Sequence, residues 1–231
     1  MATPSPIAAM FDRISPKYDA LNHLLSFNID KVWRRKTAKA VAKSHPQTIL
    51  DLATGTADLA LLLARYNPQA HIIGMDLSEK MLDIGKAKVA KCGMGNQIEL
   101  QLGDAASMPF KDNTFDAVTV AFGVRNFEDL DKGLSEIRRV LKPDGQAYIL
   151  EFSMPERFPM KQLYRIYFKR LLPIIGRIVS KDPDAYTYLP ASVERFPKPK
   201  AFLELLSQHG LGNGTTKKLT FGIATLYRTF L

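Results

Sequence analysis

The stretch TILDLATGTAD, residues 48–58, joins carboxylates to a run of small residues and is the first candidate site along the chain. Its apolar start predicts a buried parallel strand, and the LALLLARY that follows predicts a helix. A tight turn between a strand and a helix presents backbone N–H groups that bind polar or anionic ligand groups. Gly55 lets a cofactor approach the main chain closely. The stretch therefore predicts a nucleotide-binding corner, although Ala57 leaves its glycine set incomplete.

Two further aspartates follow later apolar segments. Asp76 ends the predicted strand at residues 71–75 and follows Gly55 by about 20 residues, the separation at which an acid meets ribose hydroxyls. A helix N-cap is the alternative for Asp76, because a helix begins just after it. Asp104 follows the predicted strand at residues 98–102, where a loop reaches adenine. A carboxylate there can accept a hydrogen bond from the exocyclic amine.

The segments around these residues place them at one edge of a sheet. Strands are predicted at residues 48–52, 71–75, 98–102, 115–121 and 146–152, and helices at 60–66, 79–92 and 129–141. Alternation through five units predicts an α/β fold with a doubly wound parallel sheet. Residues 10–44 and 201–209 predict helices, and residues 217–230 predict two antiparallel edge strands.

The chain length and composition predict one sizeable domain over residues 1–231, since 46% of the residues are hydrophobic. Within it we expect an N-terminal helical cap at 1–46 and a cofactor-binding core at 47–153. A lid insert at 154–200 and a C-terminal helix with a strand pair at 201–231 complete the division. An edge strand near the C-terminus would allow a homodimer.

Cysteine content and hydropathy indicate the compartment. Cys92 is the single cysteine, which fits a reducing environment. The first residues lack a charged region followed by an apolar one, and no apolar run approaches the roughly 18 residues of a membrane span. We therefore expect a cytoplasmic protein, working at the inner face of the cell membrane if it contacts lipid.

The formal charge of +9 comes largely from two basic clusters. The first, at residues 31–43, is equally well explained as a solvated helix face. The second, at residues 157–181, is interleaved with apolar residues, a mixture that suits a helix on anionic lipid. Nucleic acid is the competing explanation for the charge.

The order of four segments resembles class I S-adenosylmethionine-dependent methyltransferases: DLATGTAD, GMDLS, GDAASMPFKDNTFDAV and RVLKPDGQAYILEFS. A narrower resemblance, to the UbiE/MenG family of ubiquinone/menaquinone biosynthesis methyltransferases, rests on YDALNHLLSFNIDKVW at residues 18–33 and on the last of these four. The run FGVRN and the ending TFGIATLYR are also similar. The resemblance covers nearly the whole chain. It implies a Rossmann-like seven-stranded sheet with an antiparallel last strand, N-terminal helices and a helical lid insert.

The resemblance implies S-adenosylmethionine as cofactor and implies contacts to it from Thr56, Asp76, Asp104 and Ala105, with Gly55 needed for close approach. For two of these, Asp76 and Asp104, the positions at the strand ends lead to the same assignment. No metal site is expected.

Some positions depart from the family pattern. Ala57 replaces a glycine, which should narrow the freedom of the turn without removing the pocket. Asp30 stands for a histidine of the signature, so no role of that histidine is carried over. Ala121 stands where some relatives have a cofactor-contacting serine, and that contact is therefore not assigned.

The chemistry that the resemblance implies is methylation of a ring carbon of a polyprenylated quinol. The carbon is a poor nucleophile until the ring hydroxyl loses its proton, whose pKa resembles the value of about 10 of a tyrosine. Arg125 stays protonated and is assigned to the developing oxyanion, and Tyr18 and Asn126 to orienting a water or the substrate oxygen. A salt bridge from Arg125 to Glu128 or Glu151 is the alternative. His23 is a rival base.

Within the family, demethylmenaquinol is the expected substrate, and 2-methoxy-6-polyprenyl-1,4-benzoquinol is the alternative. The lid insert is expected to carry a helix at residues 160–178 that faces the membrane, or that simply packs on the domain. Other function classes remain. A nucleic-acid methyltransferase would explain the charge, but AFGVRN replaces the usual Asn/Asp-Pro-Pro-aromatic run. A nicotinamide oxidoreductase would not explain Asp104, and a non-catalytic scaffold would not need the full set of site residues.

Overall fold

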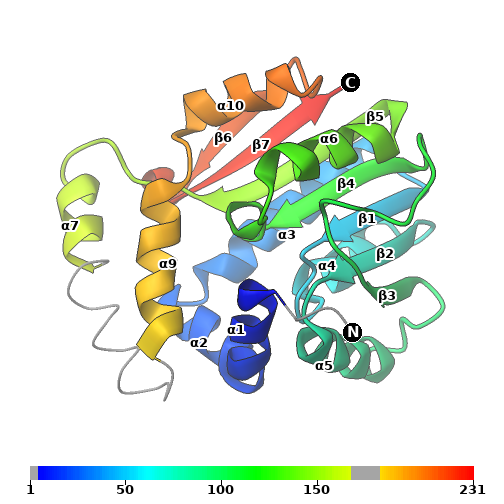
Figure 1. Cartoon of the computed structure of the whole chain (residues 1–231), viewed down its shortest axis with the longest axis horizontal. Coiled ribbons are helices and arrows are strands. Elements are labelled where there is room, and N and C mark those ends of the chain that lie inside the picture. The colour runs from blue at the N-terminus through cyan, green and yellow to red at the C-terminus, as the bar shows by residue number, and fades with distance from the viewer. Residues whose placement is uncertain (1–4, 168–182) are drawn as a thin grey trace.

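The computed structural model describes residues 5–167 and 183–231, and it places helices on both faces of a seven-stranded sheet (Figure 1). The strands are β1 Thr48–Leu52, β2 His71–Asp76, β3 Ile98–Leu102, β4 Phe115–Ala121, β5 Leu141–Phe152, β6 Thr215–Leu219 and β7 Ala224–Phe230. Their order in the sheet is β3-β2-β1-β4-β5-β7-β6. Strands β1 to β5 are parallel, and β7 is antiparallel to both β5 and β6. The α/β, doubly wound, Rossmann-like fold with an antiparallel last strand is confirmed.

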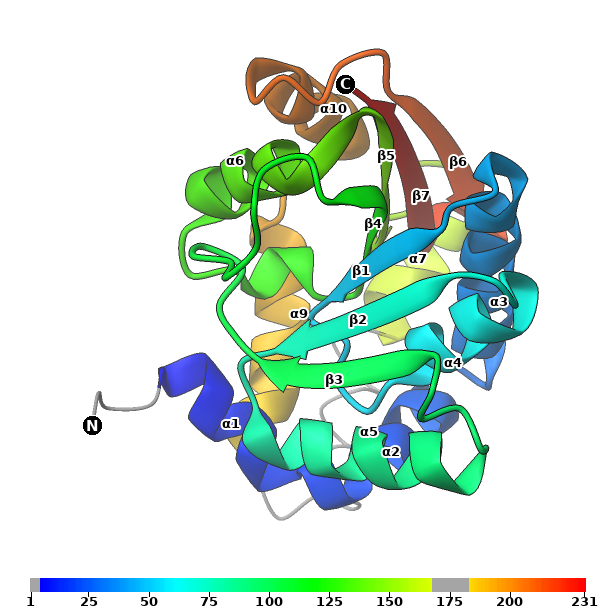
Figure 2. The same cartoon turned by 90° about the vertical axis from the view of Figure 1, so that its right-hand side faces the viewer.

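The two faces of the sheet are covered by different helices (Figure 2). On one face lie α3 Ile29–Val41, α4 Asp58–Tyr66 and α5 Glu79–Lys91, and on the other lie α6 Leu130–Val140 and α10 Pro199–Gln208. Ile49 belongs to the core on the first face, and its neighbour Leu50 to the core on the second. Both side chains are fully buried because parallel strands covered on both sides have no solvated face.

The chain reverses direction across the sheet at β1, which lies between β2 and β4. Loops that leave β1 and β4 diverge there, and a crevice opens at the carboxyl ends of the strands. Helices α1 Pro6–Ile14, α2 Tyr18–Leu25 and α9 Pro183–Arg195 lie along this edge (Figure 1). The crevice is thus roofed by segments from both the N-terminal and the C-terminal halves of the chain.

The helix predicted over residues 10–44 is divided into α1, α2 and α3. Pro16 lies in a short 3-10 turn between α1 and α2, where a proline at the start of a turn needs no N–H partner. Phe27 and Asn28 have φ values of 51° and 60°, so the chain bends sharply before α3.

Two predicted elements of the C-terminal half have different bounds. β5 begins at Leu141, ahead of the predicted residue 146, and its register with β4 shifts between Phe115 and Ala117. The helix predicted at residues 160–178 is seen as α7 Met160–Ile166, and most of its remainder lies outside the described residues. In the described ranges, no helix has both the length and the apolar character needed to cross a membrane.

Asp51 joins β1 to β4 beneath the crevice. Its Oδ1 accepts a hydrogen bond from Thr119 Oγ1 at 2.6 Å, and its Oδ2 accepts one from Thr54 Oγ1 at 2.7 Å. The residue is 1% exposed. Burial raises the pKa of Asp51 to about 6, because removing an ionised carboxylate from water disfavours its charged form.

We expect the stability of the protein to depend on Asp51 in a defined pH range. The folded chain binds a proton at Asp51 more tightly than the unfolded chain, so protonation stabilises the fold as the pH falls from about 6 to about 4. Asp51→Asn does not titrate. The free energy of unfolding of the wild type, relative to D51N, should rise by up to about 3 kcal/mol between pH 7 and pH 4.

Urea unfolding at a series of pH values measures this difference. Asp144→Asn, a change at an exposed carboxylate, serves as the control and should show no comparable rise. Parallel stability curves for the wild type and D51N would contradict the burial effect.

Candidate active site

A cavity at the carboxyl ends of β1, β2 and β4 brings together six of the eight predicted site residues. They are Tyr18, Gly55, Asp76, Asp104, Ala105 and Asn126. Thr56 and Arg125 do not line it. The remaining wall includes Ile7, Ala8 and Phe11 of α1, residues that the sequence did not indicate as part of a site. We call this space the cofactor cavity.

Asp76 is held by the backbone at the mouth of the glycine turn. Its Oδ2 accepts the N–H of Gly55 at 2.8 Å, and its Oδ1 accepts the N–H of Ser78 at 2.9 Å. Ser78, not Asp76, is the N-cap of α5, because its hydroxyl accepts the N–H of Met81. Burial raises the pKa of Asp76, and the backbone donors oppose that rise. The carboxylate therefore has a fixed orientation beside the turn.

Asp104 lines the same cavity. Its Oδ1 accepts the N–H of Ala106 at 2.8 Å, which closes a turn around Ala105. Asp104 is exposed, whereas Met81 nearby in the cavity wall is buried. A carboxylate beside apolar side chains is the arrangement that suits a flat heterocycle with an exocyclic amine.

Thr56 and Ala57 lie on the outer side of the turn. The Thr56 hydroxyl donates to Asp19 at 2.6 Å and accepts from Lys88 at 3.0 Å, so its side chain is committed to the protein. Ala57 has a φ of 65° and packs against Gly85, away from the cavity. Its methyl group leaves the pocket open, in agreement with the expectation from sequence.

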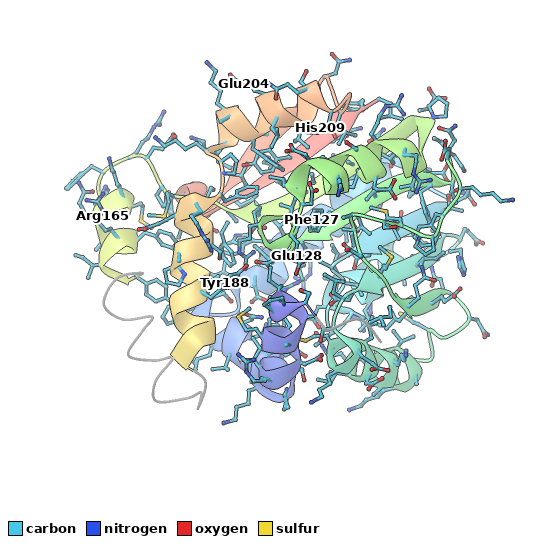
Figure 3. All side chains as sticks on the ribbon, viewed as in Figure 1. Phe127, Glu128, Arg165, Tyr188, Glu204 and His209 are labelled. Carbon is cyan, nitrogen blue, oxygen red and sulfur yellow. The ribbon has the colours of Figure 1, made fainter. Side chains whose placement is uncertain are left out.

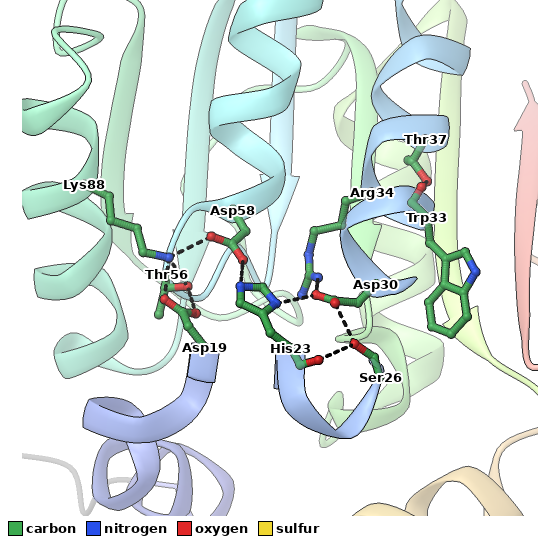
Figure 4. Close-up of polar contacts among 10 residues, drawn as sticks. All are labelled: Asp19, His23, Ser26, Asp30, Trp33, Arg34, Thr37, Thr56, Asp58 and Lys88. Carbon is green, nitrogen blue, oxygen red and sulfur yellow. Dashed lines mark hydrogen bonds and ion pairs between the residues drawn. The ribbon is translucent and has the colours of Figure 1, made fainter. Parts of the chain in front are cut away.

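A chain of polar contacts ties the N-terminal helices to this turn (Figure 4). Lys88 bridges Asp19 of α2 at 2.5 Å and Asp58 of α4 at 2.7 Å. His23 lies between Asp58, at 3.7 Å from its Nε2, and Asp30, at 2.9 Å from its Nδ1. Both ring nitrogens of His23 thus face carboxylates. This position makes His23 a connection between helices and not a group within the cofactor cavity.

A second cavity, which we call the acceptor chamber, adjoins the first and shares Phe11, Tyr18 and Phe122 with it. Its wall also contains charged side chains and a tyrosine of α9: Asp30, Arg34, Arg125 and Tyr188. Tyr18 contacts both spaces, and burial raises the pKa of its hydroxyl. The predicted pair Tyr18 and Arg125 therefore meets in the chamber, while Asn126 reaches the cofactor side.

Arg125 forms a salt bridge with Glu151, which is one of the two partners expected under the alternative interpretation of its role. Its Nη1 lies 2.7 Å from Glu151 Oε1 and donates to the carbonyl of Phe122 at 2.6 Å. Glu151 is completely buried, which raises the pKa of its carboxyl, and the Arg125 charge opposes that rise. The guanidinium also lies 5.3 Å from the ring centre of Phe152. The salt bridge to Glu151 holds the guanidinium at the wall of the chamber, so Arg125 is still part of the site.

Tyr188 and Ser192 of α9 complete the surroundings of this pair. Tyr188 donates its hydroxyl hydrogen to Asn126 Oδ1 at 2.9 Å, and Ser192 Oγ accepts from Arg125 Nε at 3.3 Å. Their spacing of one helical turn is the one pattern in the sequence that could have indicated them.

A third cavity continues outward from the acceptor chamber and shares Leu25, Phe152 and Leu189 with it. Its lining is almost entirely apolar and includes Trp33, Met160, Leu163 and Tyr164. Phe27 and Leu163 at its rim are 71% and 56% exposed. We call it the apolar tunnel. Shared lining residues thus link the three cavities in a series that begins at the glycine turn and ends at α7.

The chain matches the family model of the ubiE/COQ5 methyltransferase family over residues 2–230. It is 48% identical to the demethylmenaquinone methyltransferase of Bacteroides fragilis over 96% of this chain and 90% of that protein. It is 46% identical to the ubiquinone/menaquinone biosynthesis C-methyltransferase UbiE of Geobacter sulfurreducens over 96% of this chain and 86% of that protein.

Solved structures agree on the fold. A SAM-dependent methyltransferase from Aquifex aeolicus superposes over 100% of both chains, with a TM-score of 0.62 at 19% identity. One from Thermotoga maritima covers 97% of this chain and 99% of its own, with a TM-score of 0.63 at 15% identity. The family model and the curated relatives carry the assignment further than the fold alone: the chain belongs to the ubiE/COQ5 methyltransferase family and is an S-adenosylmethionine-dependent methyltransferase.

Proposed function

We propose that the protein methylates a ring carbon of demethylmenaquinol to give menaquinol, with S-adenosylmethionine as the methyl donor. The observation that carries this proposal is the series of three neighbouring cavities with shared lining residues: the first holds two aspartates, the second two arginines, and the third is almost entirely apolar. The parts of the two substrates follow the same order: S-adenosylmethionine carries hydroxyl and amine donors, the quinol ring can ionise, and the isoprenoid tail is apolar.

The cofactor cavity fits the parts of S-adenosylmethionine. Asp76 would accept hydrogen bonds from the ribose hydroxyls, and Asp104 one from the adenine amine, with Ala105 against the ring. Gly55 has a φ of 57° and no neighbour within 4 Å of its missing Cβ, so the cofactor can lie against its main chain. Thr56 would contribute through its backbone, because its hydroxyl is engaged elsewhere.

The acceptor chamber supplies what carbon methylation needs. The quinol must lose a hydroxyl proton before its ring carbon attacks a methyl group, and cationic donors favour that ionised form. Arg34 and Arg125 line the chamber, and a guanidinium group offers several N–H donors. Tyr18 and Phe122, shared by the two cavities, would align the ring carbon with the methyl group. A water molecule is proposed as the proton acceptor.

The apolar tunnel would hold the isoprenoid tail. Its lining is mostly aromatic and aliphatic, which suits an apolar chain, and its opening lies where a membrane-embedded tail could enter. The naphthoquinol is preferred because the relatives include proteins named demethylmenaquinone methyltransferase at 41–48% identity. A benzoquinol is the second candidate, since relatives at 45–46% identity carry the broader ubiquinone/menaquinone name.

Contact with the inner face of the cell membrane belongs to the same proposal. Helix α7 exposes Leu163 and Ile166, and it also exposes Lys161 and Arg165. Apolar side chains beside cations suit the boundary between acyl chains and anionic headgroups. The exposed Phe27 lies at the same rim. A protein seated there would receive the quinol directly from the bilayer.

Calorimetric titration tests the cofactor assignment. We expect S-adenosylmethionine to bind and NADH not to bind, and Asp76→Asn to weaken the first by about 10- to 100-fold, because a charged acceptor of the ribose hydroxyls is lost. Asp83→Asn, on the exposed side of α5, is the matched control. Wild-type affinity in D76N, or tight binding of NADH, would overturn the assignment.

Mass spectrometry of reduced short-chain quinones tests the reaction. With S-adenosylmethionine present, demethylmenaquinol should gain one methyl group at a kcat/KM at least 10-fold above that of the benzoquinol. A deletion strain of the source organism should lack menaquinone. Preference for the benzoquinol would select the second candidate, and methylation of nucleic acid in place of either would refute the proposed function.

Flotation with liposomes tests the membrane contact. Binding to vesicles that contain anionic lipid should fall at least 10-fold on combined Lys161→Glu and Arg165→Glu substitution, since each cation near the surface contributes about 1 kcal/mol. Lys91→Glu with Lys111→Glu reverses two exposed charges elsewhere and is the control. Equal loss in both double variants would show that net charge alone governs binding.

A further inference from the structure

Helix α9 reaches the two neighbouring residues Arg125 and Asn126 with side chains one helical turn apart. Figure 3 shows Tyr188 on the side of α9 that faces the centre of the molecule. Its hydroxyl meets Asn126, and Ser192 meets Arg125. Ser192 is 3% exposed and also donates to the carbonyl of Leu189, so its oxygen has a fixed place. Two hydrogen bonds thus connect α9 to the short 3-10 turn Val124–Asn126.

The contact with Tyr188 decides which end of the Asn126 amide faces the site. A tyrosine hydroxyl that donates to Oδ1 leaves the Nδ2 group directed elsewhere, because the two atoms diverge from the same carbon. Asn126 is 8% exposed and lines the cofactor cavity. Among the described residues, Nδ2 has no hydrogen-bond partner. An N–H donor that the surrounding protein does not use is therefore left on a residue that lines the cofactor cavity.

Hydrogen bonds to the protein also fix the orientation of the Arg125 guanidinium. Its Nη1 donates to Glu151 and Phe122, and its Nε donates to Ser192. Within the described part of the chain, Nη2 makes no hydrogen bond, while the residue lines the acceptor chamber. Nη2 of Arg125 and Nδ2 of Asn126 therefore remain able to donate hydrogen bonds to a ligand.

We propose that Tyr188 is a positioning residue that, together with Ser192, orients the amide of Asn126 and the guanidinium of Arg125 so that two N–H donors face the oxygen of the bound quinol. This inference rests on the proposed function, because it specifies how that site would stabilise the phenolate. Without the Tyr188 hydroxyl the amide can turn over, and its Oδ1 would then oppose a negatively charged oxygen. Ser192 has the smaller effect, since Glu151 holds Arg125 as well.

Tyr188→Phe is the decisive variant, because it removes one oxygen and keeps the ring. We expect kcat for the quinol to fall about 10-fold with KM changed less than 2-fold, since an oriented donor acts on the developing charge. The pH midpoint of kcat should rise by about one unit, which corresponds to the same factor. Ser192→Ala should also lower kcat and raise its pH midpoint, but by smaller amounts than Tyr188→Phe. Tyr66→Phe, at a half-buried tyrosine outside the three cavities, should change neither.

A bound probe separates orientation from general damage. 2-Methyl-1-naphthol carries the ring and hydroxyl of the proposed acceptor with its reacting carbon already methylated, and its phenol and phenolate absorb at different wavelengths. In the presence of S-adenosylhomocysteine, its bound pKa should be about one unit higher in Y188F than in the wild type and Y66F. An unchanged pH midpoint and an unchanged probe pKa in folded Y188F would overturn the inference.

A measurement without substrate distinguishes failure of this inference from failure of the proposed function. The side-chain amide resonance of Asn126, identified by its loss in Asn126→Asp, should shift in Y188F and stay in place in Y66F. If it does not shift, Tyr188 does not orient the amide. If it shifts but the wild type methylates no quinol, the orientation stands and the proposed substrate is wrong.

Discussion

The buried ion pair of Arg125 and Glu151 is the interaction around which the acceptor chamber is built. Arg125 follows β4, Glu151 lies near the end of the adjacent β5, and the carboxylate also accepts the N–H of Phe152 at 2.8 Å. Taking both charges out of water is costly, and only this density of hydrogen bonds offsets the penalty. Removing one partner from such a pair typically costs about 3–5 kcal/mol. Arg125, one of the two arginines of the chamber, is therefore held in place by a strand of the sheet.

The cofactor turn depends on a second constraint, its backbone conformation. Ala53, Gly55 and Ala57 all have positive φ values, and only one of them is glycine. An alanine in this region costs roughly 1–2 kcal/mol, so the turn needs external support. Asp51 supplies it from below through Thr54, and Asp76 supplies it from above through the N–H of Gly55. The acid proposed to bind ribose therefore also shapes the turn beside which the ribose would lie.

Sequence alone predicted what depends on local pattern. Asp76 ends β2 and Asp104 follows β3, and parallel strands end at one edge, so their meeting in one cavity followed from order and spacing. The orientation of Thr56 could not be predicted, because its partners Asp19 and Lys88 come from two other helices. Tyr188 was missed for the same reason: its partner Asn126 is 62 residues away in the chain. The segments of α1 that line the cofactor cavity carry no motif, only apolar side chains.

The charged side chains of the acceptor chamber are paired with one another, although the chain as a whole carries a net charge of +9. Asp30, which replaces the histidine of the family signature, lies against Arg34, Ser26 and His23. Burial raises its pKa, but the hydrogen bond from Ser26 and the charge of Arg34 outweigh it, and the pKa of Asp30 is lowered. Two arginines thus meet two carboxylates, since Glu151 already pairs with Arg125. Because each arginine already has a carboxylate partner, the proposed phenolate would be stabilised mainly by arginine and amide N–H groups directed at it at short range, and less by the net charge of the chamber.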